Sequence, residues 1–324
     1  MRETDRGGEV TTRPQRPAGW RFHQGREVTQ PLDLVTEVPG DPPLSLHMVF
    51  TRDGTYVPAA VRKPSGSGPT PAVMCLHGGS GGLGYSFLVD QMRNRGSLFD
   101  RLVAEGYLVC LTEGRMESEE AYGKGGDSVL DHEDVVEVFR YLQRRPEVDA
   151  DRIGTFGVSH GGELQMKLIS EIGDGPAAMI PTEPAVIEYL GLKHDASAEE
   201  GWAVADSSGP RVEEKLQFRG PVADDQIDLT AAQKRIDEIS PSVAILVMGR
   251  DDDHLQGLFR KLHELLSRAG KHAEWASWDH PEHAYQWGPR RAGGGYHLDA
   301  IQEATHERVA DFLNRNVRDR AQRA

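Results

Sequence analysis

Cysteine is scarce in this sequence. The chain has 324 residues and two cysteines, Cys75 and Cys110, and each lies inside an apolar run that is typical of a strand. Two thiols in a chain of this length do not make a disulfide framework, which excludes the class of small disulfide-stabilised proteins. We expect both cysteines to be reduced and to pack in the core.

Long apolar runs are also missing. No stretch approaches the roughly 20 consecutive apolar residues that a membrane-spanning helix needs. The first thirty residues are polar and rich in Arg, Gly and Pro, without the apolar segment of a secretory signal. The sequence therefore predicts no membrane association, a flexible arm over residues 1–30 and a cytoplasmic location.

Positive charge is in deficit. The chain has 37 Lys and Arg against 51 Asp and Glu, which gives a net charge of −14 at pH 7. Nucleic-acid backbones and anionic membrane surfaces repel such a chain, so neither is an expected partner. The length suits one large core with a modest insertion, and we expect a single domain over residues 31–324. A homo-oligomer whose subunits exchange their N-terminal arms remains an alternative to a monomer.

Short apolar runs alternate with helical patterns along most of the chain. The runs are nearly continuous in apolar residues, which is typical of strands covered on both faces. They lie at 72–76, 107–111, 153–158, 177–180, 243–248 and 273–278. Helical patterns lie at 130–144, from Ser159 to Gly173, and at 298–317. This alternation predicts the α/β class, with a parallel sheet and helices on both of its faces.

Three other segments complete the predicted organisation. Alternating apolar positions on either side of Asp53-Gly54 predict a β-hairpin over 33–62. Residues 83–91 are expected to form a loop that shapes a pocket. The segment 186–229 is long, acidic and weakly periodic, which favours a lid-like or substrate-shaping insertion.

A candidate nucleophile lies at a predicted strand-to-helix turn. Residues 157–161 read Gly-Val-Ser-His-Gly and match G-x-S-x-G. A serine on that sharp turn projects its hydroxyl out of the sheet, and its neighbours must be glycine because other backbone passes close by. The pentapeptide alone is a weak signal, but its position between a strand and a helix favours Ser159 as the nucleophile.

A glycine-rich turn, His77–Gly82, follows the first of the buried strands. Backbone N–H groups of Gly78 and Gly79, together with that of His160, are expected to form an oxyanion hole. The same turn matches the dinucleotide motif G-x-G-x-x-G, which requires an acidic residue about 20 residues later. The next strand ends too far along the chain to supply it, so we predict no cofactor.

An acid and a base follow the last two predicted strands. Asp251–Asp253 comes after the strand at 243–248, and one of these carboxylates is expected to orient a histidine. His283 in the loop after 273–278 is the predicted general base, and His280 is the alternative. The chain order Ser, Asp, His is that of α/β-hydrolases. A metal site at His280 and His283 is disfavoured because their loop contains proline, so we predict no metal.

Several of these segments resemble those of a known superfamily. The run from Val148 to Gly162, with the form D-x-R-I-G-x-x-G-x-S-x-G-G, resembles the nucleophile segment of prolyl-oligopeptidase-type and dienelactone-hydrolase-type α/β-hydrolases. Gly249 with Asp252 resembles their acid turn, which favours Asp252 over its two neighbours. His283, followed by a small and then an aromatic residue, resembles their histidine segment. The resemblance covers about residues 56–315 and implies the α/β-hydrolase fold.

The departures from these families bear on the function. The chain has no room for a β-propeller, no recognisable pocket for a peptide amino terminus, and a serine where dienelactone hydrolases have cysteine. We therefore predict a carboxylesterase that cleaves small-molecule esters through an acyl-enzyme, with Ser159, His283 and Asp252 as its triad. Its activity is expected to rise with pH through a pKa near 6–7, as is ordinary for histidine. A peptidase or amidase with the same triad, a non-catalytic binding protein and a nucleotide-binding oxidoreductase remain alternatives.

Overall fold

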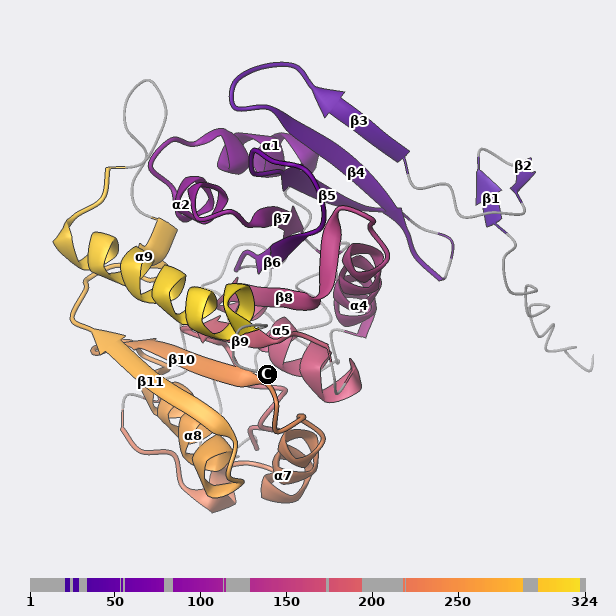
Figure 1. The fold of residues 1–324 in the computed structure, drawn as a ribbon. Coiled ribbons are helices and arrows are strands. Elements are labelled where there is room, and N and C mark those ends of the chain that lie inside the picture. The colour runs from indigo at the N-terminus through magenta and orange to yellow at the C-terminus, as the bar shows by residue number, and fades with distance from the viewer. Residues whose placement is uncertain are drawn as a thin grey trace, which may run out of the picture.

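A nine-stranded sheet forms the centre of the molecule (Figure 1). The computed structural model describes residues 21–23, 26–28, 34–52, 54, 56–78, 84–112, 114, 129–172, 175–193, 218, 220–287 and 297–320. In spatial order the strands are β11 (His272–Trp278), β10 (Ala244–Arg250), β9 (Ala178–Thr182), β8 (Val148–Val158), β6 (Thr70–Leu76), β7 (Leu108–Thr112), β5 (Tyr56–Arg62), β4 (Leu44–Phe50) and β3 (Leu34–Val38). The six strands from β11 to β7 run parallel, which confirms the predicted class.

The antiparallel edge of the sheet contains the predicted hairpin. β4 and β5 pair antiparallel, and Gly54 between them has a φ of +94°, which an L-residue with a side chain rarely adopts. β3 adds a further antiparallel strand that the sequence pattern did not predict. β1 (Arg21–His23) and β2 (Arg26–Val28) form a separate two-stranded sheet, while most of the predicted arm lies outside the described residues.

Helices cover both faces of the sheet, as predicted. α1 (Gly84–Arg93), α2 (Leu98–Ala104) and α9 (Ala300–Leu313) lie on one face (Figure 1). α4 (Val129–Gln143), α5 (His160–Ile172), α7 (Leu229–Asp237) and α8 (Gln256–Arg268) lie on the other. A π-helical turn, Asn314–Arg318, extends α9. None of the described helices is long and apolar enough to cross a membrane.

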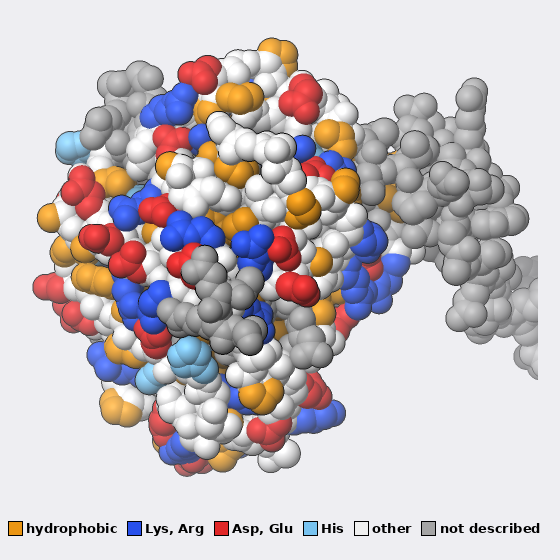
Figure 2. Space-filling model, in the orientation of Figure 1, with side chains coloured by type: hydrophobic (Ala, Val, Ile, Leu, Met, Phe, Trp, Pro, Cys, Tyr) orange, Lys and Arg blue, Asp and Glu red, His pale blue; other side chains and the backbone are white. Residues whose placement is uncertain are grey.

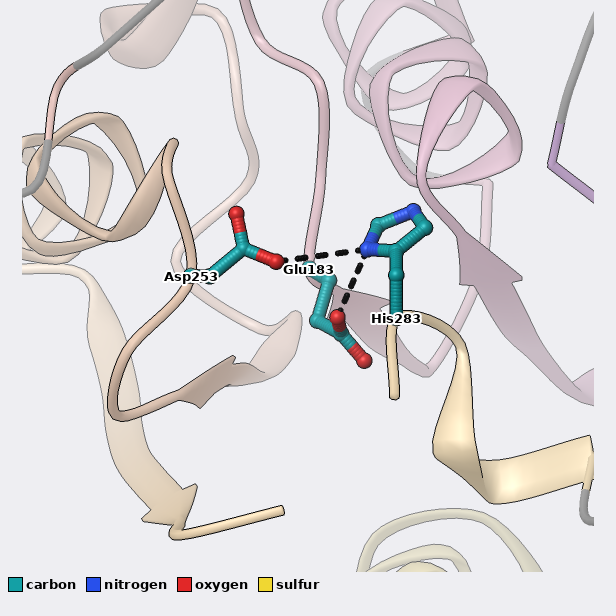
Figure 3. Close-up of side chains that lie close together, drawn as sticks. All are labelled: Glu183, Asp253 and His283. Carbon is teal, nitrogen blue, oxygen red and sulfur yellow. Dashed lines mark hydrogen bonds and ion pairs between the residues drawn. The ribbon is translucent and has the colours of Figure 1, made fainter. Parts of the chain in front are cut away.

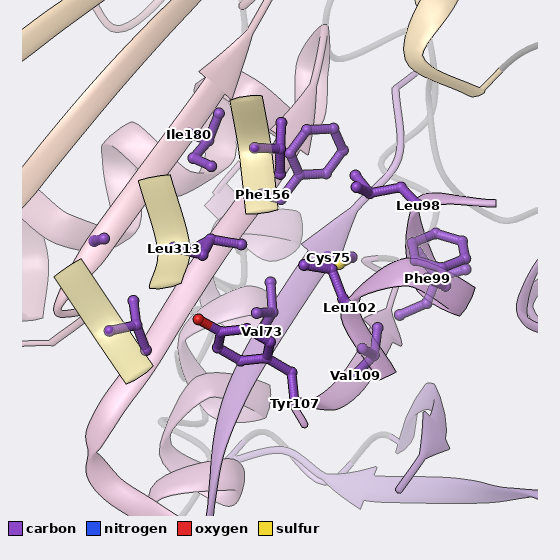
Figure 4. Close-up of a cluster of buried hydrophobic side chains, with 14 of the residues drawn as sticks. Val73, Cys75, Leu98, Phe99, Leu102, Tyr107, Val109, Phe156, Ile180 and Leu313 are labelled. Carbon is purple, nitrogen blue, oxygen red and sulfur yellow. The ribbon is translucent and has the colours of Figure 1, made fainter. Parts of the chain in front are cut away.

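Successive side chains of each strand point to opposite faces of the sheet, which divides the core into two layers. In β6, Val73 and Cys75 pack with α2 and α9 in the cluster drawn in Figure 4, whereas Met74 faces α4 and α5. This follows from the two-residue period of a strand. Cys110 of β7 pairs in register with Met74, so the two thiols lie on opposite faces. Both are free and buried, which confirms the prediction for them.

The two segments expected to shape a pocket both contain residues that pack in the core. The prediction of a loop over 83–91 is wrong, because residues 84–91 lie in α1, where Leu88 and Met92 are one turn apart and buried against the sheet. The segment predicted as an insertion begins with Val186–Leu190, whose apolar side chains pack in the core beside α7 and α8. Residues 194–217 and 219 lie outside the described residues, and the described end of the segment contains a 3-10 turn, Asp224–Gln226, before α7 begins at Leu229.

The strand order locates the site. From β6 the chain moves to β7 on one side and then returns to β8 on the other, so the direction reverses between β6 and β8. In open α/β sheets, ligands bind at the carboxyl ends of the strands beside such a reversal. Gly78 follows β6 and Ser159 follows β8, so both lie at this point.

The surface carries charges of both signs. Figure 2 shows Lys and Arg side chains interspersed with Asp and Glu side chains over one face of the molecule. The net charge of −14 therefore does not gather into a single acidic patch on that face.

Candidate active site

Ser159 lies on a strained turn between β8 and α5. Its φ is +56°, in the left-handed region that costs an L-residue with a side chain about 1–3 kcal/mol. The turn is held by the Ser159 N–H, which donates to the carbonyl of Thr182 at 2.9 Å, and by the Ser159 carbonyl, which accepts from the Ala185 N–H at 3.0 Å. The residue is 6% exposed. This is the strand–turn–helix geometry that the sequence predicts for a nucleophile.

The three glycines around Ser159 are required by close contacts. A Cβ at Gly157 would lie 2.3 Å from the carbonyl oxygen of Gly161, and one at Gly161 would lie 2.5 Å from that of His77. A Cβ at Gly162 would lie 2.8 Å from the Cβ of Pro184. Real Cβ atoms do not approach other atoms so closely, so the expectation that neighbouring backbone excludes side chains here is confirmed.

Two of the three groups predicted for an oxyanion hole lie beside Ser159. A Cβ at Gly78 would be 2.8 Å from the Cβ of Ser159, so the backbone of Gly78 is against the nucleophile. His160 is the first residue of α5, where N–H groups have no acceptor within the helix and the helix dipole is positive. Gly79, the third, lies outside the described residues.

The side chain of His160 has a different environment from its backbone. It is 4% exposed, and its Nε2 lies 3.7 Å from Oδ2 of Asp131 in α4. Burial by itself lowers the pKa of His160, but the neighbouring carboxylates of Asp131 and Glu163 outweigh it and raise the pKa. The imidazole therefore ties the start of α5 to α4.

His283 faces two buried carboxylates (Figure 3). Its Nδ1 lies 2.7 Å from Oε2 of Glu183 and 3.3 Å from Oδ2 of Asp253. Both carboxylates are fully buried, whereas the side chain of His283 is 39% exposed. The general base predicted from the sequence therefore has the acidic partner that its role requires, and also a second one.

The acid beside His283 is Asp253, not the predicted Asp252. Asp253 turns inward because Oδ1 accepts from the Leu255 N–H at 2.8 Å and Oδ2 accepts from Nη2 of Arg250 at 2.8 Å. Asp252 is exposed in the turn that precedes it. The predicted turn therefore lies beside His283, but the aspartate that faces the imidazole is one position after the predicted one.

Arg250 connects the two carboxylates. Besides its bond to Asp253, its Nε lies 3.4 Å from Oε2 of Glu183. Nη1 donates to the carbonyls of His280 and Pro281 at 3.2 and 3.3 Å, which fixes the loop that carries His283. One guanidinium thus offsets part of the negative charge and positions the histidine loop at the same time.

The carboxylates change the acidity of the histidine. Burial by itself lowers the pKa of His283, but the hydrogen bonds with Asp253 and Glu183 and their charges raise it to about 10. Burial raises the pKa of Asp253, yet the bonds from His283 and the Leu255 N–H hold it well below its usual range. The imidazole is therefore a stronger base than an ordinary histidine.

Glu183 was missed by the sequence analysis. It directly follows β9, has a φ of +43° and is fully buried. The available signal was an acidic residue after the predicted strand at 177–180, at the same sheet edge as Ser159. It was overlooked because the expected order of triad residues supplies an acid from a later strand.

His280, the alternative base, has other contacts. Its Nε2 lies 3.1 Å from Oδ2 of Asp299 at the start of α9, and its ring stacks on Tyr285 with centroids 4.8 Å apart. Within the described residues, the one group of three side chains able to hold a metal ion is Glu183, Asp253 and His283. The guanidinium of Arg250 already supplies a cation beside these carboxylates.

The strained serine, the glycine turn beside it and the carboxylate-bound histidine lie on the carboxyl edge of a parallel sheet, and they define a hydrolase of the α/β-hydrolase fold. The family model for X-Pro dipeptidyl-peptidase (S15 family) matches residues 53–293, and the chain belongs to this family. No curated protein matches the chain.

Solved structures support the fold assignment. An esterase from Pyrobaculum calidifontis matches with a TM-score of 0.56 and 19% identity, over 88% of this chain and 86% of the esterase. A putative dienelactone hydrolase from Klebsiella pneumoniae has a TM-score of 0.53 and 16% identity, over 87% of this chain and 98% of its own. Dipeptidyl peptidase 4 of Porphyromonas gingivalis has a TM-score of 0.56 and 18% identity over 85% of this chain, which spans 35% of that peptidase.

Proposed function

We propose that the protein hydrolyses carboxylic esters of small molecules through an acyl-enzyme on Ser159. The observation that carries the proposal is the strained backbone of Ser159 at the strand-to-helix turn, with Gly78 against it. An exposed serine on a flexible loop would need no such strain. A nucleophile presented at a sheet edge does.

The reaction proceeds in two halves. His283 takes the proton of the Ser159 hydroxyl as its oxygen attacks the ester carbonyl, and the oxyanion is stabilised by the N–H groups of Gly78 and His160. The alcohol leaves with the proton from His283, which forms the acyl-enzyme. Water then gives a proton to His283, attacks the acyl carbon and releases the acid, and Ser159 recovers its proton. Asp253 orients the imidazole throughout.

The basicity of His283 favours esters over amides. An imidazolium whose pKa is raised to about 10 is a weak acid, and it protonates an amine leaving group less readily than an ordinary histidine does. An alcohol departs with less help from a proton. The raised pKa thus suits a reaction with an alcohol as leaving group.

The pH dependence follows from the same contacts. The base form of His283 is the neutral imidazole, so kcat/KM is expected to rise about tenfold per pH unit between pH 7 and pH 9. The midpoint then lies well above the 6–7 expected from the sequence, because two carboxylates stabilise the imidazolium. Initial rates at low substrate concentration across pH 6–10 measure it, and a plateau reached at pH 7 contradicts it.

The nucleophile is tested by intact mass after treatment with a fluorophosphonate. We expect one adduct on the wild type and none on Ser159→Ala, which removes the attacking oxygen. Absence of an adduct on the wild type overturns the proposal and favours a binding protein. Ser170→Ala, which replaces a serine at the far end of α5, is the matched control and keeps the adduct.

Dipeptide release is a second candidate, because the family model that matches is that of an X-Pro dipeptidyl-peptidase. p-Nitrophenyl butyrate and butyryl p-nitroanilide share an acyl group and differ only in the bond that is cleaved. We expect the ester to have the higher kcat/KM by at least 10³-fold. Faster turnover of glycyl-prolyl p-nitroanilide than of the butyrate ester identifies the peptidase instead.

A further inference from the structure

We propose that Glu183 is a second positioning residue for His283, which is therefore oriented by two acids from neighbouring strands. The inference rests on the proposed role of His283 as general base. Glu183 follows β9, Asp253 follows β10, and these strands are adjacent and parallel. Glu183 is the nearer of the two, at 2.7 Å from Nδ1 against 3.3 Å for Asp253.

The contacts of Glu183 converge on the histidine loop. Its carboxylate accepts from the Ala284 N–H at 3.1 and 3.3 Å and from Nε2 of Gln286 at 3.1 Å. Ala284 directly follows His283 and has a φ of +58°. One carboxylate thus fixes both the imidazole and the backbone that carries it.

Backbone strain occurs in the nucleophile turn, in the turn after β9 and in the loop that carries His283. Among the described residues, those other than glycine with a positive φ are Ser159, Glu183 and Ala284. Strain of about 1–3 kcal/mol persists only where surrounding contacts enforce it, and it clusters at functional sites. The Glu183 N–H donates to the carbonyl of Met248 at 2.7 Å, which holds the turn in place.

The turn that carries Glu183 also holds the nucleophile. Thr182 and Ala185 lie on either side of Glu183-Pro184. The carbonyl of Thr182 accepts from the Ser159 N–H, and the Ala185 N–H donates to the carbonyl of Ser159. The position of the histidine and the position of the serine are therefore set by one short segment. Such coupling suits a proton transfer that depends on the distance between the two side chains.

Both carboxylates contribute to the negative charge around His283. The charged and titratable groups that face it or its partners include Glu183 after β9 and Arg250 at the end of β10. Asp253 and His254 follow β10, and Tyr285 lies in the histidine loop. Arg250 is shared between the two carboxylates and offsets part of their negative charge. The remaining carboxylate charge stabilises the imidazolium that forms as Ser159 attacks, and each acid retains part of this effect when the other is neutralised.

The experiment compares Glu183→Gln, Asp253→Asn and the double variant by kcat/KM against pH with a p-nitrophenyl ester. Neutralising the acid of a single-acid triad lowers kcat by about 10⁴-fold. Here we expect Asp253→Asn to lose about 10–100-fold and the double variant about 10⁴-fold. Glu183→Gln is expected to lower the midpoint of the pH profile by at least one unit, and Asp252→Asn is the control that changes neither.

A purely structural role for Glu183 gives different results. It predicts a lower unfolding midpoint for Glu183→Gln with an unchanged pH profile, and a loss in Asp253→Asn as large as in the double variant. Either result overturns the inference. If Glu183→Gln does not fold, Glu183→Asp keeps the charge at a shorter reach. It is expected to lower kcat with little change in KM while the pH midpoint stays within half a unit of the wild type, and a larger shift counts against the inference.

A measurement without substrate separates this inference from the proposed function. Titration of ¹⁵N-labelled histidine by NMR in Ser159→Ala, with His283→Gln used to assign the signal, is expected to show a lower pKa of His283 once Glu183→Gln is added. An unchanged titration in an enzyme that hydrolyses esters through Ser159 overturns the inference alone. The expected shift in a protein that hydrolyses no ester upholds the contact and overturns the proposed function.

Discussion

Gly78 lies directly against the candidate nucleophile, where no side chain fits. Its α-carbon faces Ser159 so closely that an added Cβ would also lie 3.1 Å from the carbonyl oxygen of Val158. Neither neighbour can yield without moving the nucleophile turn, which is fixed by backbone hydrogen bonds on both sides. The proposed catalysis therefore depends on a residue that contributes no side chain.

We expect Gly78→Ala to lower kcat by about 10²–10³-fold, the usual loss for one oxyanion donor, because the methyl group displaces Ser159 or the Gly78 N–H. Steady-state kinetics with a p-nitrophenyl ester measure the change. Gly220→Ala is the control, since a Cβ there meets nothing within 4 Å. A kcat within twofold of wild type in Gly78→Ala contradicts the assignment.

Helix α9 shows how an element supports the site from a distance. Asp299 caps it by accepting from the Gln302 N–H at 2.8 Å, and the side chain of Gln302 accepts from the Asp299 N–H in return. Oδ2 of the same aspartate contacts His280 in the loop that carries His283. The start of α9 and the histidine loop are therefore joined.

Loss of this cap is expected to destabilise the protein. Asp299→Ala should lower the free energy of unfolding by about 1 kcal/mol, because N–H groups at the start of α9 lose their acceptor. Urea titration followed by circular dichroism measures it. Glu307→Ala, an exposed change on the same helix, is the control. Equal stability of the two variants would show that the cap contributes nothing.

At the scale of the whole molecule, a buried histidine makes stability depend on pH. His47 in β4 is 2% exposed, and its ring nitrogens lie 2.7 Å from Oγ of Ser45 and 2.6 Å from the hydroxyl of Tyr141. Burial, with the charges of Arg145 and Lys63, lowers the pKa of His47 from 6.5 to about 4. The folded protein therefore favours the neutral ring.

The direction of the effect follows from proton linkage. Between pH 6.5 and pH 4 the unfolded chain binds a proton at His47 that the folded protein does not bind, so stability is present above this window and is lost as pH falls through it. We expect a loss of about 1–2 kcal/mol from pH 7 to pH 5 attributable to this residue. Urea unfolding of wild type and His47→Gln at both pH values tests it. An equal difference in the two proteins assigns the pH dependence to other groups.

The strand and turn patterns were predictable from the sequence because they depend on neighbouring residues. The apolar run before Ser159 and the glycines on either side of it define a strand, a sharp turn and a helix wherever they occur. The same holds for the hairpin at Gly54. α1 was not predicted, although Leu88 and Met92 are one helical turn apart and pack in the core.

The sequence by itself predicted the α/β class, the turn at Ser159 and a histidine, His283, after the last strand, since the alternation of strands and helices and the glycines around Ser159 are local patterns. Only the tertiary structure decided which acids face the histidine. The inward turn of Asp253 depends on Arg250 and on the start of α8, and Glu183 reaches His283 because β9 and β10 are neighbours in the sheet. The basicity of His283 arises from that convergence, and no local pattern encodes it.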